Sequence, residues 1–251
     1  MKLKNKVAIV TGASRGLGKE MALGLAKAGA RVVVAARSET ESGGPGGTIH
    51  TTVARIEEVG GQALPIRLDV TREESVEAMV RAVMERFGTI DVLINNAGIA
   101  FPAACWEMPL KRWELVLRVN LTGTFLCAKA VLPIMMEKRN GSIVNISSVQ
   151  ARSKGLVDTG VAYGVSKAAL ERLTTSLATE LGKFNIAVNC LKPKGSVVSE
   201  GMTFLHKQAD QSRWDTPEKM VKAAIFLAGQ DATGASGMIA TDEEVCAWHG
   251  L

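Results

Sequence analysis

The sequence predicts an α/β protein in which a single doubly wound parallel sheet carries helices on both faces. Three observations predict it. Short β-branched runs alternate with longer segments of helical period, several of these runs are apolar without alternation, and a glycine-rich turn follows the first run. Uninterrupted apolar strands are typical of parallel sheets covered on both faces, and strand–helix alternation builds such sheets. A closed (β/α)8 barrel is the structural alternative, and the motifs fit the open sheet better.

The first half of the chain supplies three strand–helix units. The strand 7–10 is an unbroken apolar run, and 19–28 behind it carries apolar residues at helical spacing. The strand 31–36 precedes a loop over 38–47, rich in glycine and acids, and a helix over 53–59. The strand 63–68 leads into a helix over 73–87, whose first turn carries Glu73 and Glu74. Acids there are favourable because the helix dipole is positive at that end.

The second half continues the alternation. The strands 90–94 and 142–146 precede helices over 112–137 and 163–183, and a sixth strand covers 187–191. The segment 194–215 lacks a clear period and is expected to be a loop before a helix over 217–228. Because no repeat and no linker divides the chain, we expect one domain over 1–251 with a substrate lid at about 194–216.

Composition and charge exclude other classes of protein. With 47% hydrophobic and 22% charged residues, the chain is ordinary for a globular protein with a sizeable core. The net charge of +5 comes without a long basic run, so we expect no nucleic-acid partner. No window approaches the apolar length of a membrane span, so we expect no membrane partner. The basic start, 1–6, precedes only the short run 7–10, which favours a buried strand over a signal peptide.

The cysteines favour a reducing compartment. They form no CxxC pair and no metal-like cluster with the histidines, so we expect free thiols, no metal site and a cytoplasmic protein. The four are Cys105, Cys127, Cys190 and Cys246.

A glycine-rich turn lies directly between the first predicted strand and the first helix. It reads Thr11-Gly12-Ala13-Ser14-Arg15-Gly16-Leu17-Gly18. Glycines let the backbone approach a pyrophosphate closely, and the helix N-terminus offers free N–H groups. An ordinary glycine turn is the alternative, but this position favours a dinucleotide site. The expected cofactor contacts here are Gly12, Ser14, Arg15, Gly16, Leu17 and Gly18.

The end of the second strand favours NADP(H) over NAD(H). NAD-selective sheets of this type place an acid there to bind the ribose hydroxyls. This chain has Ala35-Ala36-Arg37 instead, and Arg15 should approach the same spot. Two guanidiniums without a competing carboxylate suit a 2′-phosphate. The alternative is that both are solvated surface arginines.

Further motifs identify a family resemblance that covers nearly the whole chain. In order, they are the turn at 11–18, Asp69-Val70, Asn95-Asn96-Ala97-Gly98, Val119-Asn120, Asn145-Ile146-Ser147-Ser148, and Tyr163 with Lys167. Together they resemble the short-chain dehydrogenase/reductase family in its single-domain Rossmann form. Residues 47–51, Ala63-Leu64-Pro65 and Pro193-Lys194 are similar to its hydroxysteroid-dehydrogenase-like subgroup.

The chemistry of carbonyl reduction explains the catalytic residue types. A ketone needs a hydride at carbon, which nicotinamide supplies, and a proton at oxygen, which Tyr163 can supply if its pKa falls toward the working pH. Lys167 lies one helical turn later, so its charge should favour the tyrosinate. Ser148 would hydrogen-bond the substrate oxygen, with Ser147 as a structural neighbour. The resemblance implies that Asn120 anchors a water-linked proton relay. A buried core tyrosine is the alternative for Tyr163.

The resemblance also implies the remaining cofactor contacts. Asp69 and Val70 would line the adenine; the alternative for Asp69 is a helix N-cap, and it could do both. Lys167 would bind the nicotinamide ribose beside Tyr163, and Pro193 would lie near the nicotinamide. Asn96, Ala97 and Gly98 would pass along the ribose.

Two regions depart from the family pattern. Lys194 stands where a glycine is expected after Pro193, so either Ser196 or Ser199 is the hydroxyl that binds the nicotinamide amide. Lys194 could meet an acidic substrate or cofactor phosphates, or be solvated. Asp242-Glu243-Glu244 stands where many relatives have Asp-Gly-Gly.

The leading hypothesis is an NADP(H)-dependent oxidoreductase that interconverts a small-molecule ketone and a secondary alcohol, in a homo-oligomer (dimer or tetramer). The alternative is a non-catalytic NADP(H)-binding protein that senses redox state or acts as a scaffold. The set of Asn120, Ser148, Tyr163 and Lys167 argues against it, because a sensor needs no proton donor.

Overall fold

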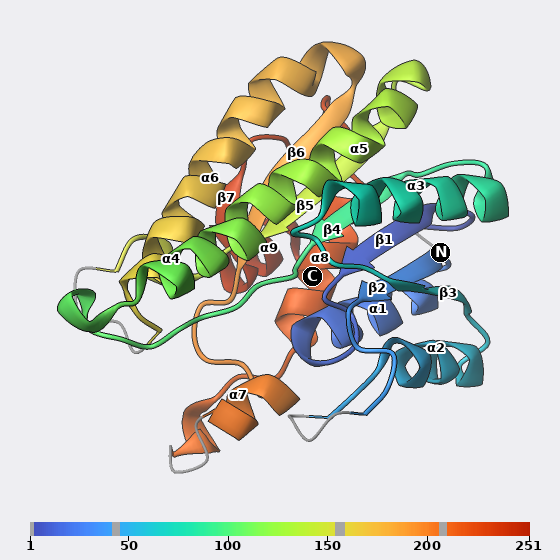
Figure 1. Ribbon diagram of the computed structural model, residues 1–251. Coiled ribbons are helices and arrows are strands. Elements are labelled where there is room, and N and C mark those ends of the chain that lie inside the picture. The colour runs from blue at the N-terminus through green and yellow to red at the C-terminus, as the bar shows by residue number, and fades with distance from the viewer. Residues whose placement is uncertain (1–2, 42–45, 154–158, 206–209) are drawn as a thin grey trace.

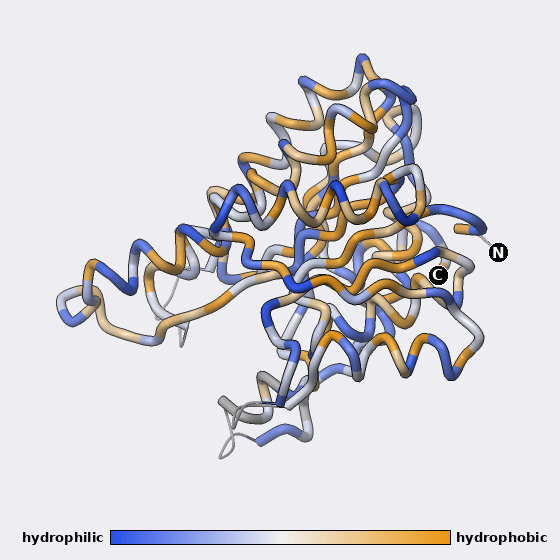
Figure 2. Tube along the Cα trace, turned by 45° about the vertical axis from the view of Figure 1, so that its right-hand side comes forward, coloured by the Kyte–Doolittle hydropathy of each residue, from blue (hydrophilic) through white to orange (hydrophobic). Residues whose placement is uncertain are grey.

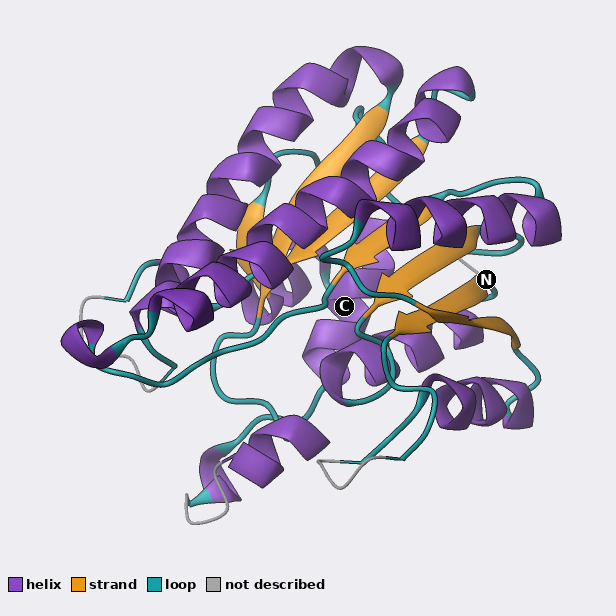
Figure 3. Cartoon of the chain, in the orientation of Figure 1, coloured by secondary structure: helices purple, strands orange, loops and turns teal. Residues whose placement is uncertain are grey.

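The computed structural model describes residues 3–41, 46–153, 159–205 and 210–251. Within these ranges the chain forms one seven-stranded parallel sheet in the order β3-β2-β1-β4-β5-β6-β7, with helices on both faces (Figures 1 and 3). The predicted doubly wound architecture is confirmed, and the barrel alternative is wrong because the sheet stays open at β3 and β7.

Six of the strands lie close to their predicted positions, and a seventh was not predicted. The short strand β7 pairs with β6 through Cys190 and Ile239. With three residues it is too short to show a strand pattern in the sequence. The strands are β1 (Val7–Thr11), β2 (Arg31–Ala36), β3 (Gln62–Arg67), β4 (Val92–Asn95), β5 (Gly141–Ile146), β6 (Ile186–Lys192) and β7 (Ile239–Thr241).

The helices correct the prediction in three places. The helix expected over 112–137 is interrupted by a π-helical turn, Arg118–Thr122, and the segment expected to be a loop over 194–215 contains α7. A last helix, α9, was not predicted. The α-helices are α1 (Gly16–Lys27), α2 (Ile49–Glu58), α3 (Glu73–Phe87), α4 (Leu110–Leu117), α5 (Gly123–Glu137), α6 (Val161–Leu181), α7 (Glu200–Leu205), α8 (Glu218–Ala228) and α9 (Asp242–His249).

Two apolar layers hold the sheet between the helices. Successive residues of β1 point to opposite faces, so that Ala8 and Val10 join one core while Val7 and Ile9 join the other. The first core is closed by α1, α2, α8 and α9, and the second by α3, α5 and α6. Figure 2 shows the resulting pattern, with hydrophobic strands at the centre and hydrophilic residues concentrated on the outer helices.

The helical stretch Leu110–Glu137 is long and apolar enough, by length and composition, to cross a membrane. The sequence-based prediction that no window approaches the apolar length of a membrane span is therefore wrong. Val116, Cys127 and Val131 in this stretch are nonetheless buried in the protein. Core helices of globular proteins pass the same test, so the observation is weak evidence for a span.

The sheet topology places a crevice at the carboxyl ends of β1 and β4. From β1 the chain proceeds to β2 on one side, while β4 pairs with β1 on the other. The connections after β1 and β4 lead to α1 and α5, which pack on opposite faces of the sheet, and such a change of direction is where parallel α/β sheets bind ligands.

Candidate active site

The turn after β1 and the loop after β4 touch so closely that only glycine fits. Gly12 has a φ of +65°, and a Cβ on it would lie 2.9 Å from the Ala97 Cα. A Cβ on Gly18 would lie 2.4 Å from the Gly12 carbonyl oxygen. The Asn96 side-chain amide donates to the Thr11 carbonyl at 2.9 Å, which ties the two loops together. These contacts hold the glycine turn at the start of α1 tightly against the loop after β4.

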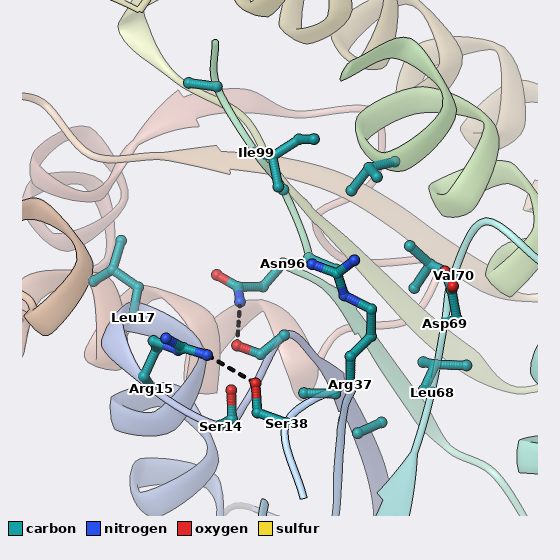
Figure 4. A pocket seen from close by; sticks show the side chains of 18 residues that line it. Ser14, Arg15, Leu17, Arg37, Ser38, Leu68, Asp69, Val70, Asn96 and Ile99 are labelled. Carbon is teal, nitrogen blue, oxygen red and sulfur yellow. Dashed lines mark hydrogen bonds between the residues drawn. The ribbon is translucent and has the colours of Figure 1, made fainter. Parts of the chain in front are cut away.

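A cavity of about 510 Å³ opens beside this turn (Figure 4). Most of the predicted cofactor residues line it: Gly12, Ser14, Arg15, Leu17, Gly18, Arg37, Asp69, Val70, Asn96, Ala97 and Gly98. Gly16, Tyr163, Lys167 and Pro193 are not among the lining residues. Sequence reasoning missed Val119 in the π-helical turn and several neighbours at or just after the ends of β2, β3 and β4, namely Ala35, Ala36, Ser38, Leu68, Ile99 and Ala100. The shape and the glycine cradle fit a dinucleotide.

Both predicted arginines line this cavity. The Arg15 guanidinium donates from Nη2 to the Ser38 hydroxyl at 2.8 Å, and Arg37 is exposed at its mouth. Burial raises the pKa of Asp69, but its hydrogen bonds from Thr71 and the charge of Arg37 outweigh burial, so the net pKa lies below the usual range.

Asp69 does not cap α3. Its Oδ1 accepts from the Thr71 N–H at 3.0 Å and from the Thr71 hydroxyl at 2.7 Å, while the residue at the N-cap position of α3 is Arg72. The helix-cap alternative is therefore wrong, because the Asp69 carboxylate binds Thr71, which lies in the turn before α3 begins.

Tyr163 and Lys167 lie together on the first turns of α6. The Lys167 Nζ is 5.5 Å from the centroid of the Tyr163 ring and donates to the Ile146 carbonyl at 2.7 Å. Burial lowers the pKa of Lys167 to about 8. The ammonium is thus held inside the protein at the end of β5, on the same edge of the sheet as the glycine turn.

The pKa of Tyr163 differs from the prediction. Burial of the phenol raises its pKa, the nearby Ser148 hydroxyl lowers it, and the net pKa lies above the usual range for tyrosine. The expected lowering by Lys167 is not found, because desolvation dominates and the ammonium is directed at the Ile146 carbonyl. At neutral pH the phenol is therefore protonated.

The two serines at the end of β5 point to different partners. The Ser148 hydroxyl accepts from the Gln150 N–H at 3.2 Å and lies near enough to Tyr163 to lower the pKa of its phenol. The buried Ser147 hydroxyl instead faces the Lys167 carbonyl and the Glu171 carboxylate, each at 3.4 Å. Of the two serines, only Ser148 lies near the Tyr163 phenol.

Asn120 lies in the π-helical turn between α4 and α5, a feature frequent at functional sites. Its Oδ1 accepts from the Ile99 N–H at 2.8 Å, and its Nδ2 donates to the Ile99 carbonyl and to Ser166 Oγ, both at 2.9 Å. A Cβ on Gly98 would lie 3.5 Å from both Asn120 Oδ1 and Lys167 Nζ. Asn120 therefore clamps the loop after β4 against α6, close to the Lys167 ammonium.

The segment after β6 places Ser196, Ser199 and Lys194 differently. Ser199 approaches the glycine turn, since a Cβ on Gly16 would lie 3.6 Å from the Ser199 Cβ, whereas Ser196 is exposed. Lys194 forms an ion pair with Glu243, and its N–H donates to Asp242 Oδ1 at 2.9 Å. The carboxylates at the start of α9 thus hold the base of this segment.

Sequence reasoning missed Glu200 entirely. Its Oε2 accepts from the Gly16 N–H at 2.8 Å, and its other oxygen pairs with the Lys19 ammonium. The contact joins residues 184 positions apart, and Glu200 lies in a segment of no clear period. No local sequence signal could therefore have found it.

Comparisons with known proteins identify the family of this chain. The family model of the short chain dehydrogenases matches residues 6–210. The chain is 33% identical over 250 residues to hydroxysteroid dehydrogenase-like protein 2 of Danio rerio, covering 100% of this chain and 60% of that protein. The chain thus spans less than two thirds of that relative.

Solved structures match over almost the whole chain. A putative dehydrogenase from Xanthomonas campestris superposes with a TM-score of 0.91 at 33% identity, covering 100% of this chain and 92% of that one. A gluconate 5-dehydrogenase from Burkholderia cenocepacia, solved with NADP and tartrate, gives a TM-score of 0.80 at 31% identity, covering 95% and 94%. The chain described here belongs to the short-chain dehydrogenase/reductase family of oxidoreductases.

Proposed function

We propose that this protein is an NADP(H)-dependent oxidoreductase that interconverts a carbonyl and a secondary alcohol, with Tyr163 as the general acid and base. The observation that carries the proposal is the pairing of Tyr163 with Lys167, whose Nζ lies 5.5 Å from the centroid of the tyrosine ring and donates to the Ile146 carbonyl, two residues before Ser148. These groups lie at the same edge of the sheet as the glycine cradle. When bound, the nicotinamide would supply or accept the hydride.

The side chains take separate roles in the reduction. As the hydride forms the new C–H bond, the electron pair of the C=O double bond moves to oxygen, and the Tyr163 hydroxyl gives its proton to that oxygen. Ser148 hydrogen-bonds the same oxygen and holds it in place. Lys167 stabilises the phenolate left behind and binds the cofactor ribose. Asn120 orders the route by which a proton from solvent restores the phenol.

NADP(H) is the proposed cofactor because the cavity has a cationic mouth. Arg15 and Arg37 both line the cavity, and β2 ends in Ala36, where a ribose-binding acid would lie. Guanidiniums bind phosphate bidentately, so they favour the cofactor that carries a 2′-phosphate. The gluconate 5-dehydrogenase that this chain resembles was solved with NADP.

The rest of the cofactor would follow the same edge of the sheet. The adenine would lie against Asp69 and Val70, and the ribose against Asn96–Gly98. The nicotinamide amide would meet Ser199 and Pro193, under a lid formed by about 194–216. The relatives differ in their named substrates, so the proposal extends only to a small-molecule ketone or alcohol.

We further propose that the protein is cytoplasmic and forms a homo-oligomer, either a dimer or a tetramer. Each copy would consist of a single domain and would bind neither nucleic acid nor membranes. All four cysteines are free thiols, which suits a reducing compartment. Large apolar side chains are exposed along α4, α5 and α6, as expected of a surface covered by a second copy. They include Leu110, Leu115, Phe125, Val161 and Val165. Light scattering of the purified protein measures the assembly directly.

The decisive test of the function is turnover. The protein is incubated with NADPH and a panel of aliphatic, cyclic and aromatic ketones, and the loss of absorbance at the NADPH band is followed. We expect oxidation of NADPH with at least one ketone, and faster turnover than with NADH. The binding-only alternative predicts that NADPH stabilises the protein against heat while no ketone is reduced.

A further inference from the structure

The N-terminus of α1 is contacted by a carboxylate from a distant part of the chain. Glu200, the first residue of α7, places Oε2 2.8 Å from the Gly16 N–H. Its Oε1 pairs with the ammonium of Lys19, one turn into α1. The side chains of Lys19 and Glu200 are 13% and 36% exposed, so the pair is partly shielded from water.

This position on α1 lacks an anion of its own. The first turn of α1 contains no acidic residue, and Arg15 at the N-cap position makes no side-chain cap. The N–H groups there have no acceptor within the helix, and the helix dipole adds positive charge. Gly16 belongs to the glycine-rich turn, so its N–H is one that a dinucleotide diphosphate would use. Glu200 thus satisfies a group that the ligand also needs.

Hydrogen bonds hold the two ends of the segment that carries Glu200, so any movement of Glu200 occurs between these ends. The Val198 N–H donates to the Asp215 carbonyl, and the Asp215 N–H donates to the Ser196 carbonyl, both at 2.9 Å. The Lys194 N–H is held by Asp242 at the same distance. These bonds join the two ends of the segment, and Glu200 lies beyond them.

The Glu200 carboxylate is charged at neutral pH. Partial burial raises its pKa, but the hydrogen bonds from Lys19 and the Gly16 N–H outweigh burial, and the net pKa lies below the usual range. A carboxylate and a diphosphate repel each other, so they cannot share one N–H group and one ammonium without a cost in binding free energy.

We propose that Glu200 is an internal competitor of the cofactor diphosphate, which displaces it from the Gly16 N–H and takes over the ammonium of Lys19. Lys19 then becomes a cofactor-binding residue, and the release of Glu200 frees α7 from the glycine turn. The inference rests on the proposed dinucleotide site, and goes beyond it by assigning a competing group and a further ligand.

The test compares Glu200→Gln with Glu20→Gln. Glu20 pairs with the same Lys19 at 3.4 Å, and its carboxylate has no hydrogen bond to the Gly16 N–H. Dissociation constants are measured by calorimetry for NADPH and for inorganic pyrophosphate, which lacks adenine and nicotinamide. We expect Glu200→Gln to bind both ligands about tenfold more tightly, the change for removal of one charge-assisted competitor. Glu20→Gln should stay within about twofold of the unmodified protein.

Two further variants keep the test decisive. Glu200→Asp retains the charge, but its carboxylate is one methylene too short for the Gly16 N–H, so it should also bind pyrophosphate more tightly. Lys19→Met should weaken binding of pyrophosphate and NADPH by about tenfold. Unchanged or weaker binding by Glu200→Gln, equal effects at Glu20 and Glu200, or no effect of Lys19→Met would each overturn the proposal.

The readout separates this inference from the proposed activity. Pyrophosphate binding needs neither hydride transfer nor a ketone. If the unmodified protein reduces no ketone, while the Glu200→Gln variant binds pyrophosphate more tightly than it does, the proposed activity is refuted and the proposed competition by Glu200 is supported. A protein that reduces ketones, with pyrophosphate affinity insensitive to Glu200, would do the reverse.

Discussion

The preference for NADP(H) depends on two guanidiniums, and their removal gives a quantitative prediction. Arg15 is oriented by its 2.8 Å hydrogen bond to Ser38, whereas Arg37 is exposed. A hydrogen bond between charged groups is worth about 1.5–3 kcal/mol, and solvent screening places exposed groups at the lower end. Arg37→Ala should therefore weaken NADPH binding about tenfold, and Arg15→Ala up to about a hundredfold.

Fluorescence titration of NADPH and NADH against each variant measures these changes. NADH lacks the 2′-phosphate, so its dissociation constant should change less than about threefold in both variants. Arg81→Ala is the matched control, because Arg81 is an exposed arginine on α3 that pairs with Glu77. If NADPH and NADH weakened equally, or if the unmodified protein bound NADH more tightly, the assignment of Arg15 and Arg37 to the 2′-phosphate would be refuted.

Three further predictions follow from the geometry of the site. Ser148→Ala should lower kcat about a hundredfold or more with little change in NADPH affinity, while Ser147→Ala should leave kcat within about tenfold; comparable losses in steady-state assays would contradict the separate roles of the two serines. Gly18→Ala should greatly weaken NADPH binding and lower the melting temperature, because its Cβ would lie 2.4 Å from the Gly12 carbonyl oxygen; a variant with unchanged calorimetric affinity would count against this close contact. The fall in the pKa of Lys167 from 10.5 to about 8 corresponds to about 3 kcal/mol of destabilisation at neutral pH. That penalty is complete below pH 8 and disappears as pH rises to the unfolded value, so Lys167→Met should stabilise the ligand-free protein in urea unfolding at pH 7 and much less at pH 10; equal effects at both pH values would contradict burial as the cause.

Short sequence patterns correctly predicted the buried strands, the position of the glycine turn and the proximity of Tyr163 and Lys167. The unbroken apolar runs of β1 and β2 identified buried parallel strands, and the glycine turn identified the ligand edge of the sheet. The spacing of Tyr163 and Lys167 placed them on one face of α6, where Lys167 Nζ lies near the tyrosine ring. In each case the signal was contained within a few residues.

The parts that could not be predicted depend on contacts between distant segments. The π-helical turn Arg118–Thr122 contains no proline or glycine, and accompanies the contacts of Asn120 with Ile99 and Ser166. The pKa of Tyr163 depends on how deeply the phenol is buried, which no spacing reveals. The meeting of Glu200 with Gly16 depends on the path of the chain after β6.

The most direct test of the account is the kinetics of Tyr163→Phe, which removes one hydroxyl and keeps the ring. With a ketone that the unmodified protein reduces, kcat should fall about a thousandfold or more, while the NADPH dissociation constant stays within about threefold, because the lost group donates the proton and does not hold the cofactor. Turnover within about tenfold of the unmodified protein, at unchanged NADPH affinity, would show that the proton comes from another group.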